Sequence, residues 1–346
     1  AHFLQDSVRG STYTLYSNNT AAQFNETQAV TSFTSTGFNL GTYTGTNTTN
    51  NTYVAWNFKA GGAAVANTDG TINTQVSVNN TLGFSISKYT GNGVSGATFA
   101  HGLGSQVNLS IVKRTDATAY WYVYSSLLPS NNNLYLNTSD GKQADGVMLG
   151  GNTTTVSISA STSVNANGGQ YVAYNFTSKP GFSKVGSYTG NGTSQSISTG
   201  FEVGFVLIKS TTSSQGWMMY DSTRGGNKYL EANSAAAEGT TTSNLVNFYS
   251  NGFGVKNSNS ENQSGQTFIY LAIAADGSTA TPSLANSFAT EIYTGNGGTK
   301  SITGTGFKPG FSWVKNRNTA GNNNNLADIV RGVNNIVVTN STGAQY

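Results

Sequence analysis

The chain has 346 residues, of which 36% are hydrophobic and only 9% are charged, and its formal net charge is +3. Soluble proteins carry about 25% charged residues, so the surface must rely on Asn, Ser, Thr and Gln, which suits extracellular and virion proteins. The Lys and Arg residues form no basic run, which argues against nucleic acid as a partner. No apolar stretch reaches the roughly 18 residues of a membrane span. The lack of cysteine excludes disulfides and thiolate metal sites.

The first recognisable motif is a box at the start of the chain, Asp6-Ser-Val-Arg9-Gly10. Asp and Arg three residues apart after a short strand predict a turn closed by a hydrogen bond and an ion pair, with glycine supplying a positive φ. We favour this structural interpretation of the box. The alternative is that each Asp–Arg pair binds the hydroxyl groups of a sugar. The box recurs as Asp221, Arg224 and Gly225, and again as Asp328, Arg331 and Gly332.

A short strand follows each box, and each domain closes on an aromatic-rich strand. The closing strands are residues 53–58, 171–176 and 270–274. Trp56, in the first of them, is expected in a hydrophobic core, as is Trp313 further along the chain. After the first closing strand, residues 61–82 are rich in Gly, Ala, Ser and Thr and predict an exposed linker.

The phrase Tyr-Thr-Gly-Asn-Gly occurs at residues 89–93, 188–192 and 293–297, at spacings of 99 (188 − 89) and 105 (293 − 188) residues. This spacing matches small all-β domains and is too long for a solenoid turn or a propeller blade. Asn-Gly predicts a hairpin turn with positive φ. The phrase lacks the Lys-Ser/Thr and the following helix of a phosphate-binding loop.

A hydrophobic run follows each phrase, at residues 107–113, 205–209 and 311–315. Apolar residues on both faces predict a strand in the middle of a sandwich. We expect the closing lysines, Lys113, Lys209 and Lys315, to end these strands at solvent. Short strands at roughly 8–12-residue spacing, bounded by Gly, Asn, Ser and Thr, predict an all-β fold of tandem antiparallel β-sandwich domains of roughly 100 residues each.

The predicted boundaries follow from these recurrences. Residues 1–60 are the C-terminal portion of a first repeat, residues 83–179 a divergent second repeat, residues 180–275 a third repeat and residues 290–346 the N-terminal portion of a fourth, with linkers at 61–82 and 276–289. Half a sandwich exposes apolar faces and open edges. We therefore expect either a longer parent polypeptide, which we favour, or half domains that complete each other within or between chains.

Two tryptophans stand just before the box position, Trp121 in the second repeat and Trp217 in the third. Sugar sites often stack a ring on an exposed aromatic side chain, so Trp121, Tyr122 and Trp217, with Asp221 and Arg224, are the candidate ligand-binding residues. Core packing is the favoured alternative for the two tryptophans. The second repeat departs from the pattern, because Tyr-Ser-Ser-Leu-Leu-Pro at 124–129 replaces its box.

The sequence offers little for catalysis. His2 and His101 are the only histidines and neither recurs with a carboxylate partner. No carboxylate pair recurs in the form of a glycosidase site, and no Asp-rich loop indicates calcium. We therefore predict no catalytic residue, no metal and no cofactor.

The ordered series of these motifs resembles the tandem lectin-like domains of tail fibres and other appendages of marine tailed phages, which look like small concanavalin A/laminin-G jelly rolls. The resemblance implies a virion-surface or extracellular adhesion protein, without enzymatic activity, that attaches to host-surface glycans or acts as a spacer. It implies self-association or other virion proteins as partners. The alternatives are a purely architectural decoration or filament-forming subunit completed by neighbouring chains, a secreted bacterial adhesin and, least favoured, a glycan hydrolase.

Overall fold

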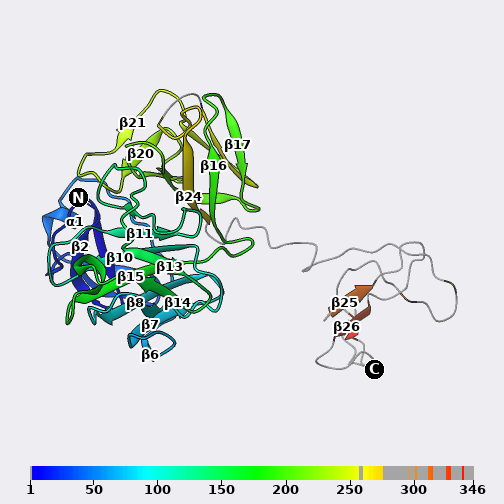
Figure 1. Cartoon of the computed structure of the whole chain (residues 1–346). Helices are drawn as coiled ribbons and strands as arrows, with labels where there is room; N and C mark the ends of the chain where they lie inside the picture. Colours follow the sequence, from blue (N-terminus) through cyan, green and yellow to red (C-terminus); the bar gives the residue numbers. More distant parts are fainter. Residues whose placement is uncertain are drawn as a thin grey trace. The chain divides into compact units, whose positions relative to one another are not determined.

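The computed structural model describes residues 2–256 and 260–275, residues 296 and 301, and the backbone of three short strands further along the chain. It divides into two compact units, Ala1–Ala280 and Thr281–Tyr346. The described residues form antiparallel strands and two four-residue helices, α1 (Thr44–Asn47) and α2 (Thr162–Asn165) (Figure 1). The predicted all-β, antiparallel sandwich class is confirmed.

Repeat 2, predicted at residues 83–179, is a two-layer sandwich that also includes two strands from residues 65–79. Its small sheet has the order β13 (Met148–Gly151), β14 (Thr155–Ile158) and β9 (Ala97–Ala100). Its large sheet has the order β12 (Leu134–Tyr135), β11 (Tyr122–Ser125), β10 (Leu109–Arg114), β15 (Gln170–Phe176), β8 (Phe84–Thr90), β7 (Thr74–Asn79) and β6 (Val65–Asn67).

Repeat 3, residues 180–275, has the same two layers. Its small sheet has the order β17 (Gln195–Ser198), β23 (Gly252–Val255) and β22 (Val246–Tyr249). Its large sheet has the order β16 (Ser183–Thr189), β24 (Thr267–Ala274), β18 (Val203–Ser210), β19 (Met218–Asp221), β20 (Lys228–Glu231) and β21 (Gly239–Thr240).

Repeat 1, residues 1–60, contains only part of this pattern. One sheet has the order β1 (Phe3–Asp6), β2 (Gly10–Tyr16) and β3 (Phe24–Asn25), and the other pairs β4 (Val30–Phe33) with β5 (Phe38–Leu40). Phe3 pairs with Tyr16 as Met218 pairs with Glu231, so β1 and β2 are the counterparts of β19 and β20.

In the second unit, β25 (Phe311–Val314), β26 (Asn325–Asp328) and β27 (Val337–Val338) form one sheet. Phe311 pairs with Asp328 as Phe205 pairs with Asp221. These three strands are therefore counterparts of β18, β19 and β20. The predicted linker at 276–289 lies outside the described residues, as do most of residues 290–346.

Residues 61–82 do not form the exposed linker that their composition predicts. They contribute β6 and β7 to the large sheet of repeat 2, and Ile72, Thr74 and Val76 are buried. Thr74, Val76 and Val78 alternate with polar residues, which is the pattern of a half-buried strand. This alternation outweighs the linker-like composition.

The Asn-Gly turn also differs from the prediction. Gly93 and Gly192 do have positive φ, of 71° and 72°. However, the strands on either side, β8 and β9 or β16 and β17, belong to different sheets, so the turn connects the two layers rather than closing a hairpin. Its backbone is held by the side chain of Asn165 in repeat 2 and of Asn262 in repeat 3.

The closing strand of repeat 3 is shifted by two residues from its predicted alignment. Tyr89 stacks on Tyr171 in repeat 2 and Tyr188 stacks on Phe268 in repeat 3, and these pairs are also cross-strand partners. Phe268, not Tyr270, is thus the counterpart of Tyr171. It follows that Leu271 corresponds to Tyr174 and to Trp56.

One cluster of buried side chains joins all three repeats. It combines Leu15 of repeat 1, Leu134 of repeat 2 and Leu207 of repeat 3, whereas two other clusters lie inside the individual sandwiches of repeats 2 and 3. In β18, Leu207 contacts the shared cluster and the next residue, Ile208, contacts the inner core. The central strands are therefore apolar on both faces because neighbouring repeats cover the face that a single sandwich would expose.

The shared cluster predicts that the three repeats unfold together. Leu15→Ala removes a fully buried side chain of repeat 1 and is expected to cost about 2–5 kcal/mol. Hydrogen exchange should then accelerate in β18 and β24 of repeat 3 as well as in repeat 1. Val65→Ala, at an exposed position, is the control. Unchanged exchange in repeat 3 would show that the repeats are energetically independent.

Candidate functional site

The first box forms a closed turn. Oδ1 of Asp6 accepts hydrogen bonds from the backbone N–H of Val8 at 3.0 Å and of Arg9 at 2.8 Å, and Oδ2 accepts from Arg9 Nε at 2.5 Å. Gly10 follows with φ of 105°, a conformation that favours glycine. Asp, Arg and Gly of the box therefore all serve to close the turn: Asp6 and Arg9 through hydrogen bonds, and Gly10 through its positive φ.

The box of repeat 3 repeats this geometry. Asp221 accepts from the backbone N–H of Arg224 at 2.9 Å and from its Nε at 2.6 Å, and Gly225 has φ of 90°. Asp328 is the last residue of β26; its side chain, Arg331 and Gly332 lie outside the described residues.

In each described Asp–Arg pair, the aspartate accepts a hydrogen bond from an aromatic side chain of another repeat. Tyr174 of repeat 2 donates its hydroxyl to Asp6 Oδ2 at 2.8 Å, and Arg9 Nη2 donates to the same hydroxyl oxygen at 3.3 Å. Trp56 of repeat 1 donates Nε1 to Asp221 Oδ2 at 3.1 Å, with the Arg224 guanidinium 5.2 Å from its ring centroid. These boxes are contacts between repeats, and Asp6 and Asp221 are buried there.

The departure of repeat 2 from the box now has a physical reason. Ser125 and Leu128 take the places of Asp and Arg, because Leu109 pairs with Ser125 as Phe205 pairs with Asp221. The residue corresponding to Tyr174 and Trp56 in repeat 3 is Leu271, and Leu128 packs against the shared cluster that contains Leu271. The Asp–Arg boxes thus face the polar groups of Tyr174 and Trp56, whereas Ser125 and Leu128 correspond to a position whose partner, Leu271, is apolar.

Trp121 and Trp217 are buried, at 0% and 2% exposure, so neither provides the stacking surface proposed for a sugar. Tyr122 is buried as well. Trp121 Nε1 donates to the backbone carbonyl of Tyr16 at 3.0 Å, and Trp217 Nε1 donates to that of Tyr135 at 2.8 Å. Each tryptophan therefore fastens its own repeat to the preceding one.

Lys113 and Lys209 are fully buried rather than at solvent as expected. Lys113 Nζ donates to Ala119 of its own repeat and to Thr20 of repeat 1, both carbonyls at 3.0 Å. Lys209 Nζ donates likewise to the carbonyls of Gln215 and Ser139 at 2.6 and 2.9 Å. Sequence reasoning missed this role because the second acceptor belongs to another repeat. Burial lowers the pKa of each ammonium group to about 8.

The contacts between repeats run in one cyclic direction. Repeat 2 donates to repeat 1 through Trp121, repeat 3 donates to repeat 2 through Trp217, and repeat 1 donates to repeat 3 through Trp56. His2 occupies the position in repeat 1 that tryptophan holds in the others, and its ring interacts with the backbone of Glu231. The three repeats therefore form a closed, pseudo-threefold ring.

One acidic residue is buried inside repeat 3. Glu261 is 2% exposed, accepts a hydrogen bond from the Tyr220 hydroxyl at Oε1 and has no partner at Oε2 among the described residues. Burial raises its pKa. Tyr188 donates to its backbone carbonyl as Tyr89 does to that of Val164 in repeat 2, so Glu261 fills a position that is apolar in repeat 2.

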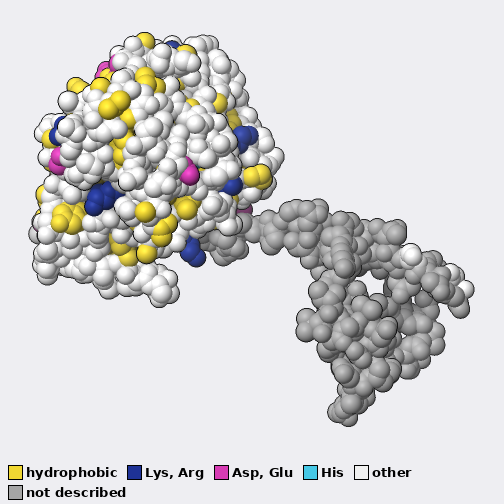
Figure 2. All heavy atoms as spheres, turned by 60° about the horizontal axis from the view of Figure 1, so that its bottom comes forward, with side chains coloured by type: hydrophobic (Ala, Val, Ile, Leu, Met, Phe, Trp, Pro, Cys, Tyr) yellow, Lys and Arg dark blue, Asp and Glu magenta, His cyan; other side chains and the backbone are white. Residues whose placement is uncertain are grey.

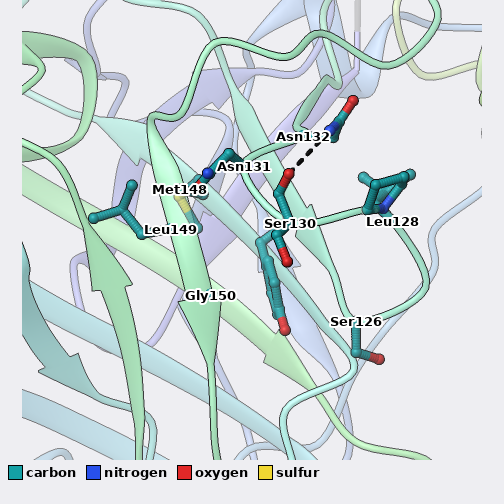
Figure 3. A pocket seen from close by; sticks show the side chains of 10 residues that line it. Ser126, Leu128, Ser130, Asn131, Asn132, Met148, Leu149 and Gly150 are labelled. Carbon is teal, nitrogen blue, oxygen red and sulfur yellow. Dashed lines mark hydrogen bonds between the residues drawn. The ribbon is translucent and has the colours of Figure 1, made fainter.

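A small polar pocket lies in repeat 2, beside the loop that replaces its box (Figure 3). Its volume is about 150 Å³. Asn131 has φ of 61°, one of two non-glycine residues with positive φ among those described. The lining, with no charged side chain, is Tyr124, Ser126, Leu128, Pro129, Ser130, Asn131, Asn132, Met148, Leu149 and Gly150. Hydroxyl and amide groups beside a tyrosine ring suit a neutral, hydroxylated ligand.

The described surface is poor in charge. Figure 2 shows isolated basic and acidic side chains among neutral atoms, with hydrophobic side chains in small groups on the face it presents. Within the described residues, no three His, Asp or Glu side chains are placed to hold a metal ion. No described helix has the length and hydropathy to cross a membrane.

Comparison with known proteins places the chain in a family. Residues 1–276 and 283–346 match the model of a domain of unknown function, DUF7483. The chain belongs to this family. No curated protein and no solved structure matches it, so the family description carries no activity, ligand or partner, and these must be argued from the residues.

The polar boxes have polar partners and the apolar position has an apolar partner. This match, called here the pairing rule, predicts that the polar contact between repeats 1 and 2 can be converted into the apolar type. Asp6→Ser alone leaves Arg9 buried without its counter-charge and should cost about 3–5 kcal/mol. Adding Arg9→Leu and Tyr174→Leu, which reproduces Ser125, Leu128 and Leu271, should recover most of that loss in urea denaturation. A triple variant no more stable than Asp6→Ser would contradict the rule.

The buried lysines predict stability that rises with alkaline pH. Each folded-state pKa, about 8, lies below the ordinary value near 10.4, so the unfolded chain binds more protons between these values and folding gains stability as pH rises through them. Between pH 7.5 and 9.5 the free energy of unfolding should rise by about 2 kcal/mol per lysine. Lys113→Met should roughly halve the slope, whereas the exposed-site variant Lys88→Met should leave it unchanged. An unaltered slope in Lys113→Met would rule out this lysine as the source.

Proposed function

We propose that this protein is a non-enzymatic structural and adhesion protein of a virion surface, such as a tail fibre, a spike or a capsid-attached appendage, and that it binds host-surface glycans. The structural role rests on one observation: the residues that recur in the sequence lie in contacts between repeats. The box, the tryptophans and the lysines are buried in contacts between repeats. Their recurrence thus serves the assembly of a rigid ring. The virion setting rests on the resemblance of the ordered motifs to phage appendage domains.

The pocket of repeat 2 is the proposed place for a glycan. The tryptophans and box residues predicted from the sequence are buried in contacts between repeats. The loop at 126–132, in contrast, lacks the Asp–Arg turn and lines a polar pocket. Carbohydrate recognition needs hydrogen-bonding groups that match hydroxyls together with an apolar or aromatic surface. Ser126, Asn131, Asn132 and the Tyr124 ring supply both kinds of group.

A purely architectural role is the second candidate. It is favoured by the burial of Trp121 and Trp217, which removes the predicted stacking platform from the surface. In this form of the proposal the ring acts as a spacer or a filament unit, and no glycan is bound.

A glycan array with the full chain separates the two candidates. The adhesion proposal expects binding to neutral glycans that Asn131→Gly weakens at least tenfold, because glycine keeps the positive φ and removes only the amide. Asn50→Gly is the matched control, since Asn50 is the other non-glycine residue with positive φ, at 67°, and lies away from the pocket lining. An array without binding would leave only the architectural candidate. Binding that Asn131→Gly does not change would place the glycan elsewhere.

A further inference from the structure

The loop that replaces the box of repeat 2 borders a second pocket, where this repeat meets repeat 3. Repeat 2 contributes Leu128, Pro129 and Lys142 to its lining, and repeat 3 contributes Thr212, Thr267 and Ile269. The volume of the pocket is about 230 Å³, and an apolar cavity of about 150 Å³ can hold a benzene ring. The pocket therefore has room for one small ring-shaped ligand.

Lys142 takes a position that a hydrogen-bond acceptor holds in the other two repeats. Its counterpart in repeat 1 is Gln23, because each lies three residues beyond the carbonyl that receives the buried lysine of the next repeat, Ser139 or Thr20. The backbone N–H of each also donates to a threonine carbonyl of that next repeat at 2.9 Å. The counterpart in repeat 3 is Glu238, since the residue after each forms the equivalent antiparallel bridge to the preceding strand.

In repeats 1 and 3 this position holds the arginine of the box. Arg9 Nη1 donates to Gln23 Oε1 at 3.2 Å, and Arg224 Nη1 donates to Glu238 Oε2 at 2.9 Å. In repeat 2, a leucine stands where the other repeats have arginine, and Lys142 stands where they have its acceptor. The position thus carries a positive charge in repeat 2, and the partner that occupies it elsewhere is missing.

Two polar groups that line the second pocket are left without a partner. Among the described residues, neither the Lys142 ammonium group nor the Thr267 hydroxyl group forms a hydrogen bond or ion pair, and both residues are half-buried. The Thr212 hydroxyl, in contrast, already donates to Gln266 Oε1 at 2.6 Å. The lining holds no carboxylate. A lone ammonium group beside a hydroxyl group suits an anionic oxygen, because charge-assisted hydrogen bonds are the stronger kind.

The apolar part of the lining favours a ring over a bare anion. Leu127, which also lines the pocket, is 42% exposed, and Ile269 is buried beside it. An inorganic anion would contact the lysine and leave this apolar surface uncovered. A hydroxylated ring that carries an anionic group covers the apolar surface and also satisfies the polar groups, as small-molecule sites generally require.

We propose that the second pocket binds an acidic saccharide, and that Lys142 pairs with the carboxylate or sulfate group of that sugar. The Thr267 hydroxyl hydrogen bonds to the sugar, and Leu127 and Pro129 contact the C–H face of its ring. Leu128 and Pro129 line both pockets, so a neutral and an acidic sugar of one glycan can occupy them together. The inference deepens the proposed function and rests on its glycan-binding form.

NMR titration of the full chain with methyl glucuronide and methyl glucoside tests the assignment, because these sugars differ only in a carboxylate and a hydroxymethyl group. The glucuronide should bind at least tenfold more tightly, shift the amide signals of Lys142 and Thr267, and bind more weakly as salt screens the ion pair. Glucose 6-sulfate shows which anionic group is preferred. Equal binding of the two methyl sugars would overturn the proposal. Inorganic sulfate that binds as tightly as the acidic sugars would reveal a simple anion site and overturn it as well.

Substitutions in the lining give the second arm. Lys142→Gln introduces the side chain that repeat 1 has at this position, so folding should tolerate it, and glucuronide binding should weaken at least tenfold. Thr267→Val should weaken binding without changing the preference for glucuronide over glucoside. Lys88→Gln, at an exposed position outside the pocket, is the matched control and should bind normally.

Glucuronide binding that survives Lys142→Gln would overturn the proposal. Neutral glycans are read separately through Asn131→Gly in the first pocket. Loss of neutral binding in that variant with no glucuronide binding at all would leave the proposed function standing and this inference refuted. Glucuronide binding that depends on Lys142, on an array where no neutral glycan binds, would give the opposite result.

Discussion

The structure depends on one constraint: each central strand must bury both of its faces. A single sandwich of about 100 residues covers only one face of its large sheet, and the other face of β10 and β18 is as apolar as the inner one. Burying that second face requires neighbours. Three repeats meet through it, and Leu15, Leu134 and Leu207 come to lie in one cluster. The repeats are therefore parts of one folding unit rather than independent modules on a string.

Polar groups enter this apolar interface only where a partner is supplied from the next repeat. Lys113 and Lys209 find two backbone carbonyls each, and Trp121 and Trp217 find one. A buried donor without an acceptor costs about 1–3 kcal/mol, and more if it is charged. These contacts fix the rotation of one repeat against the next, which apolar packing by itself leaves poorly defined.

The fold class and the recurrence could be predicted from the sequence because both rest on local signals, such as the alternation of apolar residues and the glycines of the turns. The roles of the recurring residues could not, because their partners lie in other repeats. Lys113 ends a strand, which in an isolated domain means solvent, but the backbone of residue 20 reaches it. The linker prediction is wrong for a different reason: a composition rich in Gly, Ala, Ser and Thr does not prevent a strand where Thr74, Val76 and Val78 alternate with polar residues. The pocket followed from no motif, since it arises where the box is missing.

The difference between the Asp–Arg boxes of repeats 1 and 3 and the Ser125–Leu128 pair of repeat 2 determines which repeats can contact each other in the ring. If all three contacts were alike, any repeat could pair with any other, and misassembled rings would be equally stable. An Asp–Arg box facing Leu271 would lose the hydrogen bond that Tyr174 or Trp56 donates to the buried aspartate. Ser125 with Leu128 facing Tyr174 would leave a buried tyrosine hydroxyl without its acceptor. Either mismatch is penalised, so the apolar contact between repeats 2 and 3 can form only in one place. The loss of the box in repeat 2 is then a device of specificity, and the pocket beside it is a consequence of the same substitution.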